Sequence, residues 1–513
     1  MRLRHSSRGF LATLLAVGLL ASAPAAEAAT TVVGYASEAQ LRSAVAASGG
    51  HVVRTIPSLR VAEIEGSARP FGFSSALLDR AGIGFAAGVV QRKAAAEPAL
   101  APWTSPTAPF ADAPFEWQWA ATCADAVPAS VQRAASRITI AVVDTGADLA
   151  APDLRSKATG SYSVATGTPN VRDRSGHGTF VSALAAGSIT NGQGIAGFGG
   201  DARLLVVQAG GPDGSFTDVD EAAAIVYAVD QGAKIINLSL GGSEPSIVER
   251  RAVEYASSHG VLLVAAIGNE YEDGNPVEYP AALLQPPGSR GVGGIGLSVG
   301  ASNQRGTRAS FSNTGTHVSL AAPGENVLSA LSSHSPASVY PRFSLSGPGL
   351  YGYASGTSFA APQVAGAAAL VWAARPTATA AEVAQILELS ASGRGTWNPA
   401  LGFGVLDVAA AVSTAMGTNV TDALPALRAR AALRMRILRS RSRVRVAARL
   451  RSLMPAISPA RRLVRLQGKR DRRWDTIATA KTDASGRVRW VVRSARELRV
   501  RYLGSPDLTS ATS

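Results

Sequence analysis

Residues 138–146 read ITIAVVDTG, an almost uninterrupted apolar run that ends in a carboxylate and a glycine. Four similar runs follow: residues 202–210 (ARLLVVQAG), 233–242 (AKIINLSLGG), 261–269 (VLLVAAIGN) and 295–302 (IGLSVGAS). Such runs are typical of strands that are buried on both faces. Helical patterns separate them at residues 218–231, with Asp218 as the expected N-cap, and at residues 247–259. The sequence therefore predicts an α/β unit with a doubly wound, mostly parallel sheet.

Polar residues with catalytic potential stand where these runs end, which is where ligands bind parallel sheets. Asp144 ends the first run, and His177 lies between two glycines at the start of an apolar helical segment. Ser358 opens another helical segment, where free N–H groups stabilise a nearby oxyanion. Each residue alone has an ordinary structural alternative: a turn for Asp144, a cap or packing residue for His177, and an N-cap for Ser358.

The surroundings of Ser358 weaken those alternatives. Residues 356–362 read GTSFAAP, and a chance match to this pattern in a chain of this length has a probability of roughly 10⁻³ or less. With Asp144 and the SGHGT segment around His177, this stretch resembles the subtilisin-like serine peptidases, whose Asp, His and Ser occur in this chain order. The resemblance covers about 280 residues.

This resemblance implies a role for each residue. Ser358 would be the nucleophile, His177 the general base and then acid, and Asp144 the group that orients and stabilises the imidazolium. Asn269, in AAIGN, matches the family's oxyanion asparagine and would act with the Ser358 N–H. This chain departs from the family pattern at two positions. Phe180 stands where the family usually has a second histidine, and Ile267 stands where it usually has an alanine. We expect altered packing there, with activity retained.

The resemblance also implies a substrate-binding edge. Ser239, Leu240 and Gly241 would pair with substrate as an added strand, and Leu240 and residues 265–268 would flank the P1 pocket. These residues favour an apolar P1 residue. The acidic loop that follows could instead attract basic side chains, although a solvated loop is the simpler interpretation; its acids are Glu270, Glu272, Asp273 and Glu278.

Charge is distributed unevenly along the 513 residues. The chain has a formal net charge of +14, yet residues 424–513 alone contain 24 Lys/Arg and 5 Asp/Glu. Residues 111–423 contain 16 basic and 25 acidic side chains. This distribution excludes a DNA-binding surface spread over the whole chain, and we expect no specific nucleic-acid partner. The lone Cys123 excludes an intramolecular disulfide.

The order of patterns predicts five segments. Residues 1–28 have basic, apolar and A-x-A parts and are predicted to be a signal peptide, so the protein is expected to be secreted. Residues 29–93 have a βαββαβ pattern, with a helix at residues 74–81 and a last strand at residues 85–91. The remaining segments are a Pro/Ala-rich linker (94–113), the catalytic domain (114–418) and a basic all-β sandwich (424–513).

The resemblance implies that the small α+β module at residues 29–93 is an inhibitory propeptide, and we expect self-cleavage within residues 92–113. The arginines of the sandwich are expected to line its solvent faces, where they would bind an anionic surface polymer or simply be solvated. No cofactor is implied for the chemistry. Structural calcium occurs in the family, but the chain lacks a D-x-D-x-D-G loop, so a metal site stays open.

The leading hypothesis is a secreted serine endopeptidase that acts on proteins or peptides and is made as a self-inhibited precursor. A non-catalytic binding protein is a second class, but a decayed enzyme would be expected to have lost one of its four active-site residues, and all four are present. An exopeptidase on the same fold is a third class. It would need a cap near the substrate amine, for which the sequence has no motif.

Overall fold

The computed structural model divides the chain into two compact units, Met1–Thr55 with Arg60–Gly88, and Ile56–Leu59 with Val89–Ser513. It describes residues 29–66, 84–94, 116–192, 194–336, 340, 342–343, 350–417, 431–439, 443–452, 460–470, 473–492, 497–502 and 511–512. The predicted signal peptide, the predicted helix at residues 74–81 and nearly all of the predicted linker lie outside these ranges. Among the helices in these ranges, none is long and apolar enough to cross a membrane.

In its described residues, the smaller unit is an antiparallel sheet with the helix α1. Its elements are β1 (Ala29–Gly34), α1 (Glu38–Ser48), β2 (His51–Ile56), β3 (Val61–Gly66) and β4 (Phe85–Gly88), and the strand order is β2-β3-β1-β4. Helix α1 begins at a capping box of Ser37 and Gln40 and ends at Gly49, which has left-handed backbone angles. Leu41 and Ala44 of this helix share a small core with Val33 and Ile64. The described elements have the order β-α-β-β-β, which agrees with the predicted βαββαβ pattern except for its second helix, which lies outside the described residues.

The predicted strand at residues 85–91 is wrong in its extent. Strand β4 ends at Gly88, and a separate strand, β5 (Gln91–Ala94), joins a sheet of the larger unit. The chain leaves the first sheet because the Val90 N–H donates to Asp218 Oδ1 (3.0 Å), while the Val90 carbonyl accepts from the Asp218 N–H (2.9 Å).

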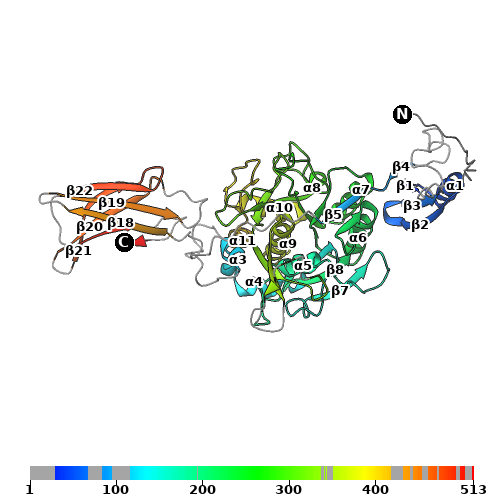
Figure 1. Cartoon of the computed structure of the whole chain (residues 1–513), viewed down its shortest axis with the longest axis horizontal. Coiled ribbons are helices and arrows are strands. Elements are labelled where there is room, and N and C mark those ends of the chain that lie inside the picture. The colour runs from blue at the N-terminus through cyan, green and yellow to red at the C-terminus, as the bar shows by residue number, and fades with distance from the viewer. Residues whose placement is uncertain are drawn as a thin grey trace, which may run out of the picture. The chain divides into compact units, whose positions relative to one another are not determined.

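A seven-stranded parallel sheet forms the centre of the larger unit (Figure 1). Its order is β14-β13-β12-β10-β6-β8-β7, and each neighbouring pair is parallel. The five predicted runs correspond to β6 (Thr139–Asp144), β8 (Arg203–Gln208), β10 (Ile235–Leu238), β12 (Leu262–Ala266) and β13 (Gly296–Ser302). The edge strands β7 (Ala158–Ser163) and β14 (Leu320–Pro323) were not predicted, because β7 is polar and partly exposed and β14 has only four residues.

Helices cover both faces of this sheet, which confirms the doubly wound α/β class. On one face α5 (His177–Ala186) packs against α9 (Thr357–Ala374), and α10 (Ala380–Ser390) and α11 (Val408–Ala415) pack against α9. The other group is α6 (Asp218–Asp230), α7 (Ile247–Ser258) and α8 (Ala281–Leu284). Helix α9 contacts five of the strands, and residues 357–372 of it are buried. Burial of a whole helix against the sheet fixes the position of its N-terminus.

The N-cap of α6 is Thr217, so the expectation of Asp218 is wrong. The Thr217 hydroxyl accepts from the Asp220 N–H at 3.0 Å, and Asp220 completes a capping box. Asp218 is the first helical residue, and its carboxylate accepts from Val90 N–H and from the Ser246 hydroxyl. Asp218 therefore contacts residues distant in the sequence, Val90 and Ser246, and does not cap its own helix.

Shorter elements complete the larger unit. They are α3 (Trp117–Ala121), α4 (Ala129–Ala134), β9 (Ser215–Thr217), β11 (Leu240–Gly241), β15 (Val327–Ala330), β16 (Arg342–Phe343), β17 (Tyr351–Ala354) and the 3-10 turns Pro57–Leu59, Ala124–Ala126 and Ala135–Arg137. Cys123 is half-buried, and burial raises the pKa of its thiol. This free thiol therefore stays protonated at neutral pH.

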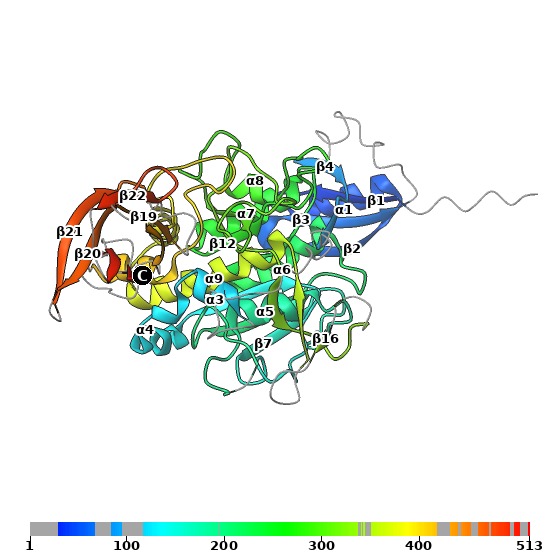
Figure 2. The ribbon, with the colours of Figure 1, turned by 60° about the vertical axis from the view of Figure 1, so that its left-hand side comes forward.

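The C-terminal strands form an all-β sandwich, as predicted. One sheet has the order β18 (Ala431–Arg439), β19 (Val444–Ser452), β22 (Arg487–Val492), and the other has β21 (Arg473–Lys481), β20 (Leu463–Arg470), β23 (Leu498–Tyr502), β24 (Ala511–Thr512). Figure 2 shows β19 and β22 in one layer and β20 and β21 in the other. On β19, Val444, Val446 and Ala448 are buried, whereas Arg445 between them is exposed. Period-two alternation thus turns apolar side chains inward.

Candidate active site

Asp144 is the last residue of β6, a strand in the interior of the parallel sheet between β10 and β8. Its side chain is buried. Its Oδ1 accepts hydrogen bonds from the Thr145 N–H (2.7 Å) and from His177 Nδ1 (2.7 Å). The carboxylate is therefore held rigidly against the histidine ring and fixes the ring's orientation.

Glycines on both sides of His177 allow this approach. Gly176, the N-cap of α5, has a φ of 98°, a conformation that favours glycine. A Cβ at Gly178 would lie 2.1 Å from the Gly146 carbonyl oxygen and 3.1 Å from Asp144 Oδ1. Only glycine lets the helix start come this close to the loop after β6. The SGHGT pattern therefore has a steric cause.

Asp173 organises the turn before His177, and the sequence reasoning did not single it out. Its carboxylate accepts from Gly176 N–H (2.8 Å), Thr179 N–H (2.8 Å), the Thr179 hydroxyl (2.6 Å) and the Thr145 hydroxyl (2.9 Å). Burial raises the pKa of the Asp173 carboxyl, although the hydrogen bonds from Thr179 and Gly176 act in the opposite direction. An acid a few residues before an expected helix start was the available signal, because it can cap that helix.

Ser358 is the second residue of α9 and is tied to the end of β10. The Ser358 hydroxyl donates to the Ser239 carbonyl at 3.2 Å, and the Ser239 hydroxyl donates to the Ser358 carbonyl at 2.7 Å. The ring of Phe359, the next residue, lies 5.6 Å from the His177 ring between centroids. The structure thus brings the starts of α5 and α9 together at the end of the sheet, and direct pairing of Ser358 with His177 stays a prediction.

Asn269 follows β12 and is anchored to the start of α9. Its Oδ1 accepts from the Thr357 N–H (2.8 Å) and from the Thr357 hydroxyl (2.9 Å). The Thr357 hydroxyl in turn accepts from the Gly268 N–H at 3.2 Å. Because Oδ1 is held at Thr357, the donor end of the amide, Nδ2, faces away from it. That orientation suits a donor to a negative charge that develops beside Ser358.

The two positions that depart from the family pattern are buried. The Phe180 ring packs on Phe359 with centroids 4.4 Å apart and lies 5.7 Å from Tyr340. Ile267 is fully buried, and its N–H donates to the Val299 carbonyl at 3.1 Å. Phe180 fills the space between α5 and α9 with apolar contacts, in place of a polar group.

Three glutamates, Glu270, Glu272 and Glu278, lie in the loop after Asn269. Glu278 is buried, and its carboxyl stands so close to Gly241 and Gly268 that a Cβ on either glycine would lie 2.7 Å from it. Burial and a hydrogen bond with Glu270 raise the pKa of Glu278 to about 9. At neutral pH the Glu278 carboxyl is therefore protonated. It lies between the end of β12, which precedes Asn269, and strand β11, which follows Ser239.

A model of the subtilase family matches residues 135–404, which contain all of these side chains. The chain belongs to the subtilase family. It is 37% identical over 270 residues to the "Thermophilic serine proteinase" of Bacillus sp. (strain AK1), a match that spans 52% of this chain and 60% of that protein. It is 35% identical to "Subtilisin BL" of Lederbergia lenta, over 51% of this chain and 86% of the relative. The family is one of serine peptidases, hydrolases that act on peptide bonds.

The crystal structure of fervidolysin from Fervidobacterium pennivorans, described as a keratinolytic enzyme related to subtilisin, covers 92% of this chain at a TM-score of 0.61. The chain covers 70% of fervidolysin, with 23% sequence identity, so this likeness supports the subtilase fold alone. Within the described ranges, no three His, Cys, Asp or Glu residues gather where they could hold a metal ion. Subtilases generally need no cofactor for catalysis.

Proposed function

We propose that this subtilase is a secreted serine endopeptidase, made as a self-inhibited precursor, with Asp144, His177 and Ser358 as its catalytic triad. The observation that carries the proposal is the buried Asp144–His177 pair, 2.7 Å apart, at the start of a helix that packs against the helix of Ser358. The base and the group that orients it are thus preorganised beside a serine at a helix N-terminus.

The residues would act in the usual order for acyl transfer. Ser358 Oγ attacks the substrate carbonyl while its proton moves to His177 Nε2, and Asp144 stabilises the imidazolium. The oxyanion accepts hydrogen bonds from Asn269 Nδ2 and the Ser358 N–H. The C–N bond then breaks as His177 gives the proton to the leaving amine, and water, activated by His177, hydrolyses the acyl-enzyme.

Substrate would bind as an added strand along Ser239, Leu240 and Gly241. The chain itself provides an instance, because β5 pairs with β11, with Ala94 opposite Leu240 and Lys93 opposite Gly241. Strand β5 is an internal segment, so this edge accommodates a chain that continues on the amino side. That favours an endopeptidase over an exopeptidase, which would need a cap near the substrate amine.

The N-terminal unit would be the inhibitory propeptide, with β5 lying in the cleft as a substrate-like strand. A substrate bound in this register and extended by one residue would pair that residue with Ser239, whose carbonyl accepts from the Ser358 hydroxyl. We therefore expect self-cleavage between Ala95 and Ala96, inside the predicted range of residues 92–113. The mature N-terminus, read by mass spectrometry of the secreted protein, tests this; a first residue other than Ala96 contradicts the register.

Casein hydrolysis with and without a serine-directed fluoride inhibitor tests the proposed activity. We expect hydrolysis that the inhibitor abolishes, and no hydrolysis by the Ser358→Ala protein. A mature, folded protein that cleaves neither casein nor peptides would favour the non-catalytic binding protein. Chelator added in the same assay, with the melting temperature recorded, tests for structural calcium.

The basic sandwich would bind an anionic polymer at the cell surface. Support comes from its exposed arginines, which include Arg434, Arg436 and Arg445, and from the acidic balance of residues 111–423. Retention of the full chain on heparin should weaken with salt and disappear when residues 424–513 are deleted. Equal retention of both proteins would mean that the arginines of the sandwich are solvated and do not bind the polymer.

A further inference from the structure

An arginine from β5 is buried inside the larger unit, in a pocket formed by the residues that contact it. Strand β5 lies between β9 and β11 and pairs antiparallel with both. Its Arg92 is opposite Phe216 of β9, and the Arg92 side chain is fully buried. Lys93, the next residue, is exposed. A buried guanidinium is costly unless it is completely paired, so the pocket around Arg92 identifies what it is built to hold.

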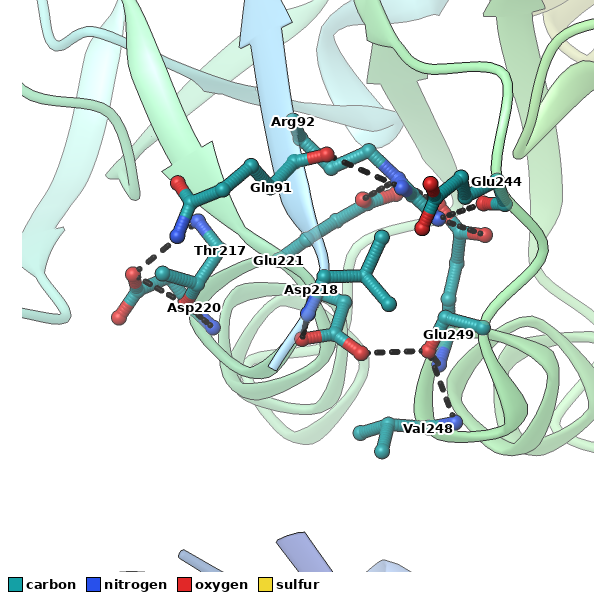
Figure 3. A network of polar contacts seen from close by, with 11 residues as sticks. Gln91, Arg92, Thr217, Asp218, Asp220, Glu221, Glu244, Val248 and Glu249 are labelled. Atoms are coloured by element: carbon teal, nitrogen blue, oxygen red, sulfur yellow. Dashed lines mark hydrogen bonds and ion pairs between the residues drawn. The ribbon is translucent and has the colours of Figure 1, made fainter. Parts of the chain in front are cut away.

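The pocket matches the donor geometry of arginine (Figure 3). Arg92 Nε donates to Glu249 Oε1 and Nη2 donates to Glu249 Oε2, both at 3.0 Å, so the pairing is bidentate. Nη2 also donates to the Glu244 carbonyl at 2.9 Å, and Nη1 to the Gln91 carbonyl at 3.2 Å. Lysine has no planar fork and could not make this set of contacts.

A second carboxylate faces the same guanidinium. Glu221 Oε2 lies 3.9 Å from Arg92 Nε, and both side chains have no exposed surface. Glu221 comes from α6 and Glu249 from α7, two helices that pack together. Burial and the nearby Glu249 raise the pKa of Glu221, whereas Glu249 and Glu221 together outweigh burial and raise the pKa of Arg92. Glu221 therefore favours its protonated form, and the bound guanidinium offsets the negative charge of Glu249.

The register gives the position of this pocket relative to the nucleophile. Leu240 is opposite Ala94, and Ser239, whose carbonyl accepts from the Ser358 hydroxyl, precedes Leu240. In a chain bound in this register, the residue opposite Ser239 is the one whose carbonyl is attacked. The residue in the acidic pocket comes three positions before it. It is therefore the fourth residue on the amino side of the cleaved bond, the P4 position.

We propose that this pocket selects substrates, so that the enzyme prefers proteins with arginine at P4, and that Glu249 and Glu221 are the residues that determine this specificity. The inference rests on the proposed endopeptidase function. Within the described part of the chain, the cation paired with these glutamates is Arg92. Once the propeptide is cut and released, a substrate arginine replaces it. An apolar P4 residue would leave the buried carboxylate of Glu249 without a cation.

The test uses mature enzyme from the full chain and internally quenched peptides of sequence Xaa-Lys-Ala-Ala-Ala-Glu, which copy residues 92–97. With Xaa as Arg, Lys, Ala, Leu or Glu, we expect kcat/KM to be on the order of 10²-fold higher for Arg than for Ala. Lys should fall roughly tenfold below Arg. Replacing the second residue, Lys, by Ala should change the rate by less than about threefold, because that side chain is exposed.

Variants of the pocket complete the test. Glu249→Gln should lower the preference for Arg over Ala at least about tenfold, and Glu249→Leu should reverse it in favour of the Leu peptide. Cleavage of the Leu peptide shows that this variant is folded. Glu254→Gln is the matched control, because it removes the same charge from an exposed position on the same helix; its preference should equal that of the wild type.

The outcomes separate the two proposals. An enzyme that hydrolyses casein but cleaves the Arg, Ala and Leu peptides equally overturns the P4 inference and leaves the endopeptidase intact. The P4 inference is also overturned if Arg92→Ala weakens propeptide inhibition while peptide selectivity is absent, because the pocket then serves inhibition alone. A folded, mature protein that cleaves neither casein nor any peptide removes the proposed function and the inference with it.

Discussion

The larger unit contains two buried carboxylate sites that are neutralised in different ways. Asp144 meets His177 at 2.7 Å, and both residues lie inside the segment that matches the family. Glu249 and Glu221 meet Arg92, which lies outside that segment, on the strand that precedes the proposed cleavage site. On the proposed roles, the chemical site is complete within the fold, whereas the recognition site is completed by the chain that binds to it.

This contrast predicts that damage to the two sites separates rate from selectivity. Removal of a residue at the Asp144 site should slow every substrate alike, since the chemistry is common to all of them. Removal of a residue at the Arg92 site should change the ranking of substrates.

The largest effect is expected from Ser358→Ala, which removes the proposed nucleophile. Peptidase activity should fall by roughly 10⁴- to 10⁶-fold, and the protein should accumulate as an uncut precursor that still binds its own β5 strand. Hydrolysis of the Arg peptide and the size of the secreted chain measure both effects. Ser310→Ala, at an exposed position, is the control. Normal maturation of the Ser358→Ala protein in a protease-deficient host would contradict self-cleavage.

The next largest effect is expected at Asn269. Asn269→Ala should lower kcat by about 10²- to 10³-fold with little change in KM, because the lost hydrogen bond forms only as the oxyanion develops. Thr357→Val removes the hydroxyl that donates to Asn269 Oδ1 but keeps the N–H, so a fall of roughly tenfold is expected. A change confined to KM in the Asn269 variant would argue against an oxyanion role, and an unchanged ratio between Arg and Ala peptides is expected for both variants.

The two carboxylate sites also differ in how far the sequence revealed them. Asp144, His177, Asn269 and Ser358 stand at the ends of buried runs or the start of a helix and form a chain-order pattern, so both the α/β fold and these candidates could be predicted. Asp173 could not, because its role depends on hydrogen bonds to Thr145 and Thr179 that only the folded turn creates.

The roles of Glu221 and Glu249 could not be predicted from the sequence, for a different reason. Each lies in a helical pattern, where an isolated glutamate usually faces solvent, and their partner Arg92 is 157 residues before Glu249. The predicted strand at residues 85–91 ended one residue before that partner. Arg92 reaches the space between α6 and α7 because β5 pairs with β9 and β11. The hydrophobic periodicity of a sequence does not indicate such a pairing.

A further buried acid, Glu388 on α10, extends the comparison to a carboxyl with no cation among the ion pairs of the described residues. Burial raises its pKa to about 8, against a hydrogen bond with Ser319 that lowers it. The folded protein therefore binds more protons than the unfolded chain between about pH 4.5 and 8, and its free energy of unfolding falls as pH rises through that window.

Glu388→Gln removes that dependence. The variant should match the wild type near pH 4.5 and exceed its free energy of unfolding at pH 9 by on the order of 3 kcal/mol. Urea denaturation of both proteins, in a Ser358→Ala background that prevents autolysis, measures the difference at each pH. Glu254→Gln, an exposed change, should show no such gain. Parallel stability curves for wild type and Glu388→Gln would mean that the Glu388 carboxyl ionises freely in the fold.

The smallest effect concerns Glu278, an acid whose pKa is raised to about 9 by burial and by its neighbour Glu270. Below pH 9 the neutral carboxyl beside Gly241 and Gly268 would narrow the P1 pocket, which favours a small uncharged residue such as alanine. Above that pH it ionises, so the kcat/KM of a P1 Lys peptide relative to a P1 Ala peptide should rise by roughly tenfold between pH 7 and 10.

Glu278→Gln should abolish that rise because the amide does not titrate, and Glu278→Ala should raise the P1 Phe to Ala ratio about tenfold by widening the pocket. Arg92 also acts electrostatically on Glu278 in the precursor, so these ratios are measured on mature enzyme, with P4 fixed as arginine. A Lys to Ala ratio that is high and constant over the whole pH range would show that Glu278 is already ionised by its substrate. A basic P1 side chain would then neutralise the buried Glu278, just as Arg92 neutralises a buried glutamate in its own pocket.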